Sequence, residues 1–373
     1  MNVKSLLLGS AAALLAVSGA RAADAVVVAE PEPMEYVRIC DVYGAGFYYI
    51  PGTETCLKVG GLVRYQIDAR SGDDGFRTQA LARLKFDARS ETEYGTFKRY
   101  IEFQAATNNQ NGGWSSFYRD DNEGFAGIWG GAPNESGTAI RHAYFQLGGL
   151  LVGHTDTLFD GDLSGEFDKG GGERINQVRY TFDAGNGVAL SVGLEEESNN
   201  YDYVPLVTGK ISIAQGWGSV NLYAGYDNAY EEFALKAIAK IKATDALTLE
   251  LIGTYESGPT YWSLYSPYQG YEWSAGGYLK YQVNEKLAVG FGGQYFGNAH
   301  RGGVWGSNTS VNTLVVSDSS DSDWVVGGVI DYKIVENLNA KLALNYGDGD
   351  TSAYRRANGD GSFFGFLRLD AEF

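Results

Sequence analysis

Long apolar runs, histidines and basic residues are all scarce in this 373-residue chain. After residue 22 no window contains 18 consecutive apolar residues, which excludes a helical membrane span in the body of the chain. Only three histidines occur, and none lies near a Gly-x-Ser-x-Gly motif, so we do not expect an enzyme with a nucleophile and a histidine base. The net charge of −17 argues against nucleic acid as a partner, because phosphates require lysine and arginine.

Proline is also rare, with 7 residues, whereas the chain holds 51 glycines, 26 tyrosines, 18 phenylalanines and 7 tryptophans. This usage is far from that of a helical enzyme. Glycine and tyrosine at this density favour a transmembrane β-barrel, which has small lumen side chains and aromatic girdles. A secreted β-sandwich or β-propeller is the alternative that composition alone leaves open.

The first residues have the three parts of an export signal. Lys4 supplies a positive charge, residues 6–17 form a short apolar stretch, and a small-x-small cleavage site ends at Ala22. The apolar stretch is too short to span a membrane. We therefore expect cleavage between Ala22 and Ala23, with residues 1–22 removed as a signal peptide.

Only two cysteines, Cys40 and Cys56, are present. In an exported chain such a pair is typical of one disulfide, which would stabilise a short closed loop by roughly 3 kcal/mol. Free or redox-active thiols are the alternative, and two cysteines alone make a poor metal site. We expect a periplasmic tail and this disulfide-closed segment over residues 23–56, followed by the barrel over residues 57–373.

Strict alternation of apolar and polar residues, the period of a β-strand, recurs from Leu57 to the C-terminus. In the first strand Val63 and Tyr65 share one face, and Arg64 lies on the other. The last strand alternates in the same way and ends on Phe373, as is typical of an outer-membrane barrel whose last strand closes against its first. Many apolar faces end in Tyr, Phe or Trp, which predicts aromatic belts at a membrane interface.

Sixteen strands are predicted, separated alternately by short turns and mostly longer loops. The short turns are 90–95, 148–149, 183–187, 215–218, 243–246, 284–286 and 335–337. The longer loops are 70–76, 108–137, 157–173, 197–206, 228–231, 257–271, 298–322 and 348–361. We therefore predict an all-β fold: a 16-stranded antiparallel transmembrane β-barrel with short periplasmic turns, long extracellular loops and a water-filled channel.

Three blocks of this sequence resemble the alphaproteobacterial porins of the rhizobial type. The most specific block runs from Cys40 to Lys58 and continues through residues 61–64, and the others are residues 143–150 and 216–219. The resemblance extends from the signal peptide to the last residue. It implies a trimeric general-diffusion porin of the Gram-negative outer membrane. It also implies that the barrel-assembly machinery recognises Phe373 and that the third long loop folds into the lumen.

That third loop, residues 157–173, is expected to narrow the lumen. Acidic side chains on it, opposed by basic side chains of the wall, would set up a transverse field that selects solutes by size and charge. Arg141 is ambiguous, because Ala143 and Phe145 share its parity and form an apolar face. A solvated loop with scattered lumen charges is the alternative, and the acidic spacing matches no EF-hand calcium site. The predicted acidic set is Asp156, Asp160, Asp162, Glu166 and Asp168, and the predicted basic set is Arg64, Arg83, Lys85, Arg174 and Arg179.

The expected partners follow from the resemblance. Small hydrophilic solutes and ions would pass the channel, the outer wall would contact outer-membrane lipid and lipopolysaccharide, and the chain would form a homotrimer. Some related outer-membrane proteins with a similar mature start are linked to peptidoglycan, which makes a link through Ala23 a hypothesis beside a free tail. A substrate-selective porin and an adhesin or receptor that acts through its loops are the alternative functions. No cofactor is expected.

Overall fold

The computed structural model describes residues 38–72, 75–108, 136–196, 204–265, 267–305, 313–351 and 360–373. The chain divides after Arg38 into two units, of which the second, Ile39–Phe373, holds all of the strands described below. The expected signal peptide, its cleavage site at Ala22 and Ala23, and the tail up to residue 37 lie outside the described residues.

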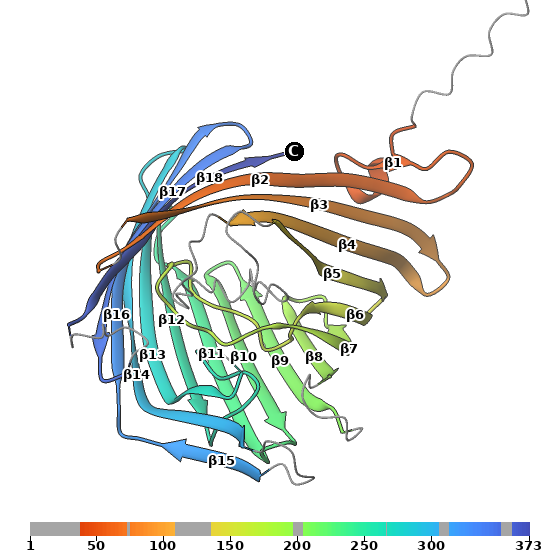
Figure 1. Ribbon diagram of the computed structural model, residues 1–373. Helices are drawn as coiled ribbons and strands as arrows, with labels where there is room; N and C mark the ends of the chain where they lie inside the picture. Colours follow the sequence, from red (N-terminus) through yellow and green to blue (C-terminus); the bar gives the residue numbers. More distant parts are fainter. Residues whose placement is uncertain are drawn as a thin grey trace, which may run out of the picture. The chain divides into compact units, whose positions relative to one another are not determined.

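Sixteen antiparallel strands of the described chain form one closed sheet (Figure 1). Strands that follow one another around the ring are paired, and the last, β18, pairs with the first, β2. The predicted 16-stranded barrel is thus confirmed. Its strands are β2 (Cys56–Arg70), β3 (Phe76–Thr92), β4 (Gly95–Asn108), β5 (Ser136–Leu147), β6 (Leu150–Asp156), β7 (Arg174–Asp183), β8 (Val188–Glu195), β9 (Leu206–Gln215), β10 (Gly218–Asp227), β11 (Glu232–Lys242), β12 (Leu247–Glu256), β13 (Gln269–Gln282), β14 (Leu287–Trp305), β16 (Asp323–Val335), β17 (Leu338–Gly349) and β18 (Ser362–Glu372).

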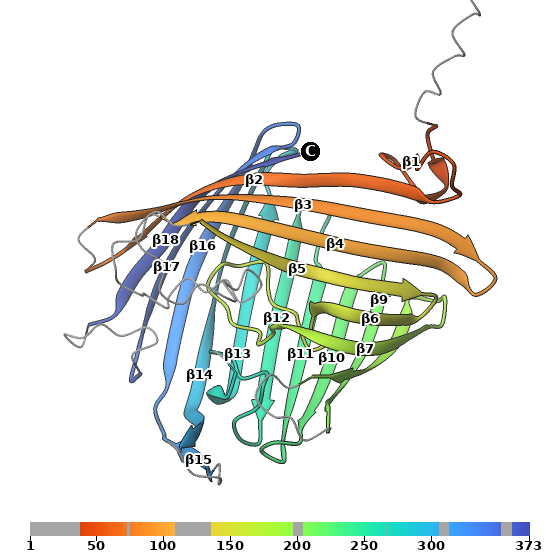
Figure 2. The ribbon, with the colours of Figure 1, turned by 45° about the vertical axis from the view of Figure 1, so that its right-hand side comes forward.

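A small disulfide-closed segment precedes the barrel. Cys40 and Cys56 form the predicted disulfide, with Cα atoms 6.0 Å apart. Between them lie a 3-10 turn, η1 (Asp41–Tyr43), and β1 (Tyr48–Tyr49), which pairs with the start of β2. This segment and the C-terminus lie at the end of the barrel that carries the short turns (Figure 2), here called the short-turn end; the opposite end is the long-loop end.

The segment 298–322, which the sequence predicts to be a loop, is largely a continuation of the sheet. β14 extends to Trp305, and β15 (Thr313–Asp318) pairs with that extension. His300, expected in the loop, therefore lies on a strand and is only 6% exposed. In the part of the chain that the structure describes, no helix is long and apolar enough to cross a membrane.

The alternation along each strand directs polar side chains inward and apolar ones outward. On β2 Arg64 is 7% exposed, whereas its neighbours Val63 and Tyr65 are 55% and 45% exposed. On β18 Arg368 is 7% exposed and Leu367 44%. An outer surface rich in Val, Leu, Phe and Tyr around a polar interior is stable in hydrocarbon rather than in water.

Aromatic side chains on the outer face pair across neighbouring strands toward the long-loop end. The ring centroids of Trp273 and Tyr295 are 5.3 Å apart, and those of Trp324 and Tyr346 are 5.6 Å apart. Tyr346 also lies 4.6 Å from the ring of Phe363. Rings in such a row are what an aromatic belt at a membrane interface would require.

The seam between β18 and β2 is held by side-chain and backbone hydrogen bonds. Inside, Arg64 donates from Nε to Asp370 Oδ1 (2.6 Å) and from Nη2 to Oδ2 (3.0 Å). Within the sheet, the backbone of Phe373 exchanges two hydrogen bonds with Gly61, at 3.0 and 3.1 Å. The Phe373 ring lies over Gly61, where a Cβ would overlap the backbone oxygen of Arg83 and come within 2.8 Å of the ring. Only glycine permits this close approach.

Candidate functional site

The segment between β6 and β7, residues 157–173, lies inside the ring of strands (Figures 1 and 2). Its bounds are those predicted from the sequence. Phe159, Leu163 and Phe167 are 2–3% exposed and pack in a cluster with side chains of the inner wall. Full burial of a large apolar side chain stabilises by roughly 1.5–3 kcal/mol, so this cluster favours the inward position of the loop.

A buried lysine on β11 binds the neck of this loop. Lys236, 3% exposed, donates from Nζ to the carbonyl oxygens of Gly161 (2.9 Å), Gly170 (2.7 Å) and Gly171 (3.2 Å). Its ammonium group also lies 4.6 Å from the centroid of the Phe159 ring. The two arms of the loop therefore converge on one positive charge.

Side chains of β12 and β14 bind the backbone of the loop farther along. Glu250 accepts hydrogen bonds from the backbone nitrogen and the hydroxyl of Ser164, both 2.6 Å long. The amide of Gln294 exchanges two hydrogen bonds with the backbone of Lys169, at 2.8 and 2.9 Å. The wall thus supplies partners for polar backbone groups that a buried loop must satisfy.

Three alternate strands end at the long-loop end on a buried carboxylate. Glu195 of β8 and Asp227 of β10 are 0% exposed, and Glu256 of β12 is 2% exposed. Glu195 accepts hydrogen bonds from Thr157 Oγ1 (2.6 Å) and from the backbone nitrogen of Leu158 (2.7 Å). The first residues of the inward loop are therefore anchored directly to the wall.

A second loop, which follows β12, packs on the first. Trp262 is 0% exposed, and its indole Nε1 donates to Thr157 Oγ1 (3.1 Å) and Glu195 Oε2 (3.2 Å). The Trp262 ring lies 5.5 Å from that of Phe159. The sequence places a loop here but does not predict that it turns inward, since apolar residues also occur in exposed loops.

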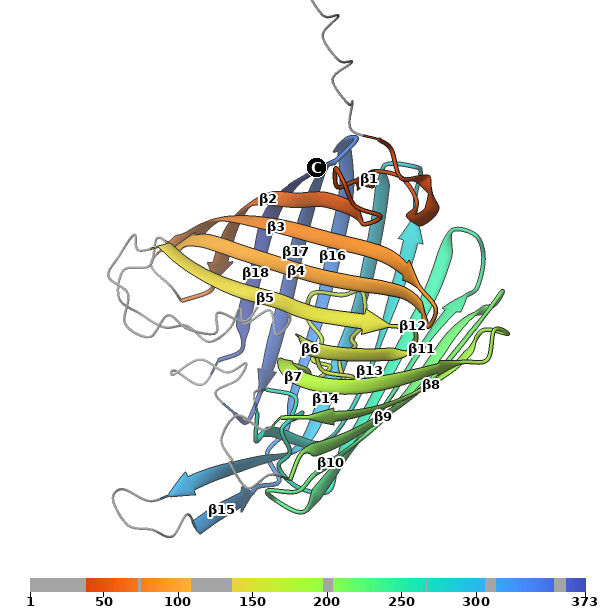
Figure 3. The same cartoon turned by 90° about the vertical axis from the view of Figure 1, so that its right-hand side faces the viewer.

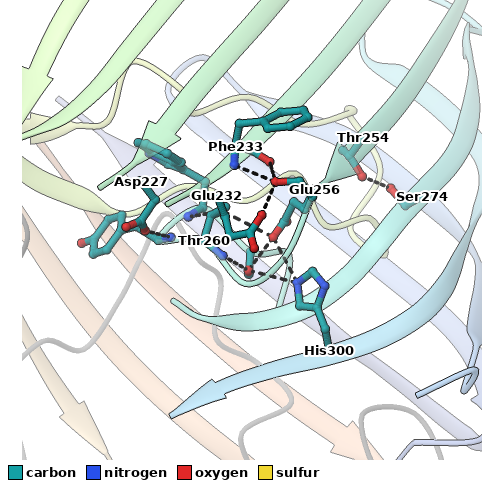
Figure 4. A network of polar contacts seen from close by, with 12 residues as sticks. Asp227, Glu232, Phe233, Thr254, Glu256, Thr260, Ser274 and His300 are labelled. Carbon is teal, nitrogen blue, oxygen red and sulfur yellow. Dashed lines mark hydrogen bonds and ion pairs between the residues drawn. The ribbon is translucent and has the colours of Figure 1, made fainter. Parts of the chain in front are cut away.

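Figure 4 shows the polar network at the base of this second loop. His300 Nε2 lies 3.1 Å from Glu256 Oε2, and both side chains are buried. Ser263 Oγ donates to the same carboxylate at 2.6 Å, whereas its distance to His300 is 3.4 Å. The serine is therefore held by the carboxylate, and the group is a structural network rather than a nucleophile and base.

The tip of loop 157–173 and the wall line an open cavity of about 410 Å³. Two carboxylates of the loop, those of Asp162 and Glu166, share this space with two guanidinium groups of the wall, those of Arg83 and Arg141. Glu166 also pairs with Lys341, whose Nζ is 2.6 Å from its Oε1. The remaining lining residues are Leu163, Ser164, Gly165, Lys280 and Asp331.

A β-bulge brings Arg141 into this cavity. β5 carries one extra residue, Arg141, between the partners of Glu102 and Phe103 on β4. Ile140 and Phe145 are 53% and 43% exposed on the outer face, whereas Arg141 is 6% exposed. The bulge shifts the alternation by one residue and settles the ambiguous parity. In the sequence, the bulge is indicated by the odd spacing between Ile140 and Phe145, two outward residues that a regular strand would place an even number of residues apart.

The two guanidinium groups share their partners on β4. Arg141 Nε lies 3.1 Å and Arg83 Nε 3.8 Å from Glu102 Oε1. Gln104 Oε1 accepts from Arg83 Nε (2.8 Å) and from Arg141 Nη1 (3.2 Å). The shared hydrogen bonds fix the orientation of both guanidinium groups on the wall.

The predicted acidic residues fall into two groups. Asp162 and Glu166 line the cavity. Asp168 instead accepts a hydrogen bond from the backbone nitrogen of Leu163 within the loop, at 2.6 Å. Burial raises the pKa of Asp160 and that of Asp168, the latter to about 7, so Asp168 carries less charge near neutrality than an exposed carboxylate.

The other predicted basic residues lie away from the cavity lining. Arg174 is 3.9 Å from Asp156, and this pair closes the base of the loop where β6 and β7 meet. Arg64 pairs with Asp370 at the seam. Lys85 and Arg179 share the parity of the inward residues on β3 and β7 and are half-buried. Of the predicted basic set, only Arg83 is among the cavity residues.

Comparisons with known proteins agree with this architecture. The model of a family described as the porin subfamily matches residues 24–365. The chain is 41% identical to porin Omp2b of Brucella canis over 315 residues and of Brucella abortus over 313 residues, 77% of this chain and 83% of each relative. The fold resembles OmpT of Vibrio cholerae, described as a trimer form (TM-score 0.54, 10% identity, 86% of this chain and 100% of that one). It also resembles a mutant of Rh. blastica porin (TM-score 0.52, 13% identity, 85% of this chain and 100% of that one).

Proposed function

The chain belongs to the porin subfamily and is a diffusion channel of the Gram-negative outer membrane, and from this premise we propose how it selects solutes. Small hydrophilic solutes and ions pass a constriction between loop 157–173 and the basic wall on β3 and β5. The cavity that Asp162 and Glu166 share with Arg83 and Arg141 is the observation that carries this proposal.

Opposite charges across a narrow aqueous gap act on everything that passes. Screening in physiological salt extends over about 8 Å, so charges facing one cavity are not fully screened from one another. Water and zwitterions align in the resulting field, whereas an apolar solute must break that hydration to pass.

Ion selectivity in planar bilayers under a KCl gradient tests this proposal. Arg83→Gln should shift the reversal potential towards cation preference, and Arg141→Gln should do the same. Asp162→Asn should shift it towards anions, because the fixed positive wall then dominates. Lys286→Gln, which removes an exposed charge from a short turn, is the matched control and should leave the potential unchanged. Equal reversal potentials for all four variants would show that these residues do not line the constriction.

We further propose that the chain assembles as a homotrimer with its short turns in the periplasm. The likeness to OmpT of Vibrio cholerae, described as a trimer form, supports this assembly. Native mass measurement in detergent should give a trimer, and channels should close in three equal steps. A monomeric mass with single-step closure contradicts the proposal.

The remaining expected partners belong to the same proposal. The outer wall would contact lipid and lipopolysaccharide, and Phe373 would be recognised by the barrel-assembly machinery. Cleavage after Ala22 would expose Ala23 as the site of a peptidoglycan link. Mass spectrometry of muramidase-digested sacculi tests that link, and the absence of any muropeptide containing Ala23 rules it out.

A further inference from the structure

Three aromatic side chains form a group on the inner wall, here called the aromatic platform: Tyr100 of β4 with His142 and Tyr144 of β5. The ring of Tyr100 lies 5.3 Å from that of Tyr144 and 6.0 Å from that of His142. All three residues are half-buried and share the parity of the inward residues on their strands. The register partner of Tyr100 on β3 is Asp87, which is four residues from Arg83. The platform therefore lies roughly 13 Å from Arg83 along the strand, toward the short-turn end.

Charged side chains hold the rings in place. The hydroxyl of Tyr100 donates to Glu102 Oε2 at 2.9 Å. Lys98 Nζ donates to the hydroxyl of Tyr144 at 3.0 Å and lies 4.9 and 5.4 Å from the centroids of the two tyrosine rings. Asp87 lies 3.8 Å from the same ammonium group. A ligand that packs on rings already oriented in this way loses less conformational entropy on binding.

The inward loop is attached mainly to strands other than β4 and β5, which carry the platform. Its contacts with Lys236, Glu250 and Gln294 lie on β11, β12 and β14. β12 is eight strands from β4 in a ring of sixteen and is therefore on the opposite side. In Figure 3, β4 and β5 are on the near side of the ring.

We propose that the aromatic platform is a weak binding subsite for neutral carbohydrates that have passed, or are about to enter, the constriction. This inference rests on the proposed function, since it requires an open channel. Conduction requires binding strong enough to favour entry and weak enough to permit release, which suits a shallow ring surface rather than a closed pocket.

The chemistry of the platform favours a neutral polyhydroxylated solute over an ion. A pyranose has an apolar face of C–H groups that packs on a tyrosine ring, and hydroxyls at its edge that need donors and acceptors. Around the rings, Asp87 and Glu102 supply acceptors and Lys98 supplies donors. The charges are already paired with one another, because Asp87 also binds Arg89 bidentately at 2.7 and 2.9 Å. Hydroxyls of a bound solute can join these existing pairs.

Sugar-dependent block of the ion current tests the subsite. The full-length protein is reconstituted in planar bilayers, the open-channel conductance is recorded, and maltotriose is then added to each side in turn. We expect a saturable increase in current noise. Tyr100→Leu and Tyr144→Leu should each weaken the apparent sugar affinity by roughly three- to tenfold, with the open conductance retained.

Two further variants separate the subsite from general damage to the barrel. Tyr144→Phe keeps the ring and should retain most of the block. Tyr180→Leu replaces an outward tyrosine that is 57% exposed and should bind maltotriose like the unmodified channel. Channels that conduct but show no saturable block, or equal block in all variants, overturn the subsite and leave the proposed function standing. Absence of conductance before sugar is added would instead refute the proposed function.

Discussion

Replacement of Lys236 with methionine should release the inward loop from the wall. The substitution keeps a long side chain but removes three hydrogen bonds, at 2.9, 2.7 and 3.2 Å, to the carbonyls of Gly161, Gly170 and Gly171. Each hydrogen bond to a charged group contributes roughly 1.5–3 kcal/mol. Loss of the buried charge offsets part of this, because ion desolvation disfavours the native state by several kcal/mol.

The net weakening of loop docking is expected to be about 3 kcal/mol, which corresponds to roughly a hundredfold larger population of undocked loop. Single-channel recording should detect it as rapid fluctuations between the normal conductance and a larger one. Release should also admit larger neutral solutes, measured as a higher size cutoff in liposome swelling.

Lys210→Met is the matched control. Lys210 and Lys236 are the register partners of Tyr223 on either side, and the ammonium of Lys210 lies 4.6 Å from its ring. The control therefore removes the same charge from the same part of the wall without removing the three bonds to the loop. If both variants show the same noise and cutoff, the lysine acts only through its charge and the loop is held by its other contacts.

Two predictions concern the barrel seam and its stability. Asp370→Asn removes the carboxylate that binds Arg64 bidentately, and the Arg64 side chain is only 8% exposed. The free energy of unfolding should fall by about 1–2 kcal/mol, so the heat-induced mobility shift in electrophoresis should occur at a lower temperature. An unchanged temperature refutes this role. Gly61→Ala should reduce the yield of folded barrel in detergent, because the added Cβ would overlap the backbone oxygen of Arg83 on β3 and would lie 2.8 Å from the Phe373 ring. Gly216→Ala, where a Cβ meets nothing within 4 Å, is its control, and equal yields contradict the argument.

The strands and their connections could be predicted because their signal is local. A period of two residues fixes which side chains share a face, and glycines mark the turns without reference to distant residues. The turn at 148–149, the turn at 243–246 and the loop at 157–173 accordingly have the bounds predicted from the sequence. Closure of the ring also follows, since an open sheet edge cannot be satisfied in lipid.

The arrangement inside the lumen could be predicted only in part. The parity of Arg141 is ambiguous in the sequence, because a bulge depends on the pairing between β4 and β5 and changes the face of every residue beyond it. The role of Lys236 could not be predicted, because its partners are backbone carbonyls, which leave no residue-specific trace in the sequence. Because Arg64 points inward, the sequence predicts that it lies at the constriction. Its partner is instead Asp370, 306 positions away, and the register of the seam that joins them cannot be read from either strand alone.

The attachment of the loop to strands other than β3 to β5 makes selectivity and architecture separable. Side chains of β8, β11, β12, β14 and β17 hold the loop, whereas Arg83 and Arg141 lie on β3 and β5. Residues of β3 to β5 can therefore diversify between related channels, or be redesigned for a chosen permeant, while the opposing scaffold and its many hydrogen bonds stay intact. Variation in permeability among such channels should accordingly concentrate on that arc of the wall, and the scaffold should accumulate few changes.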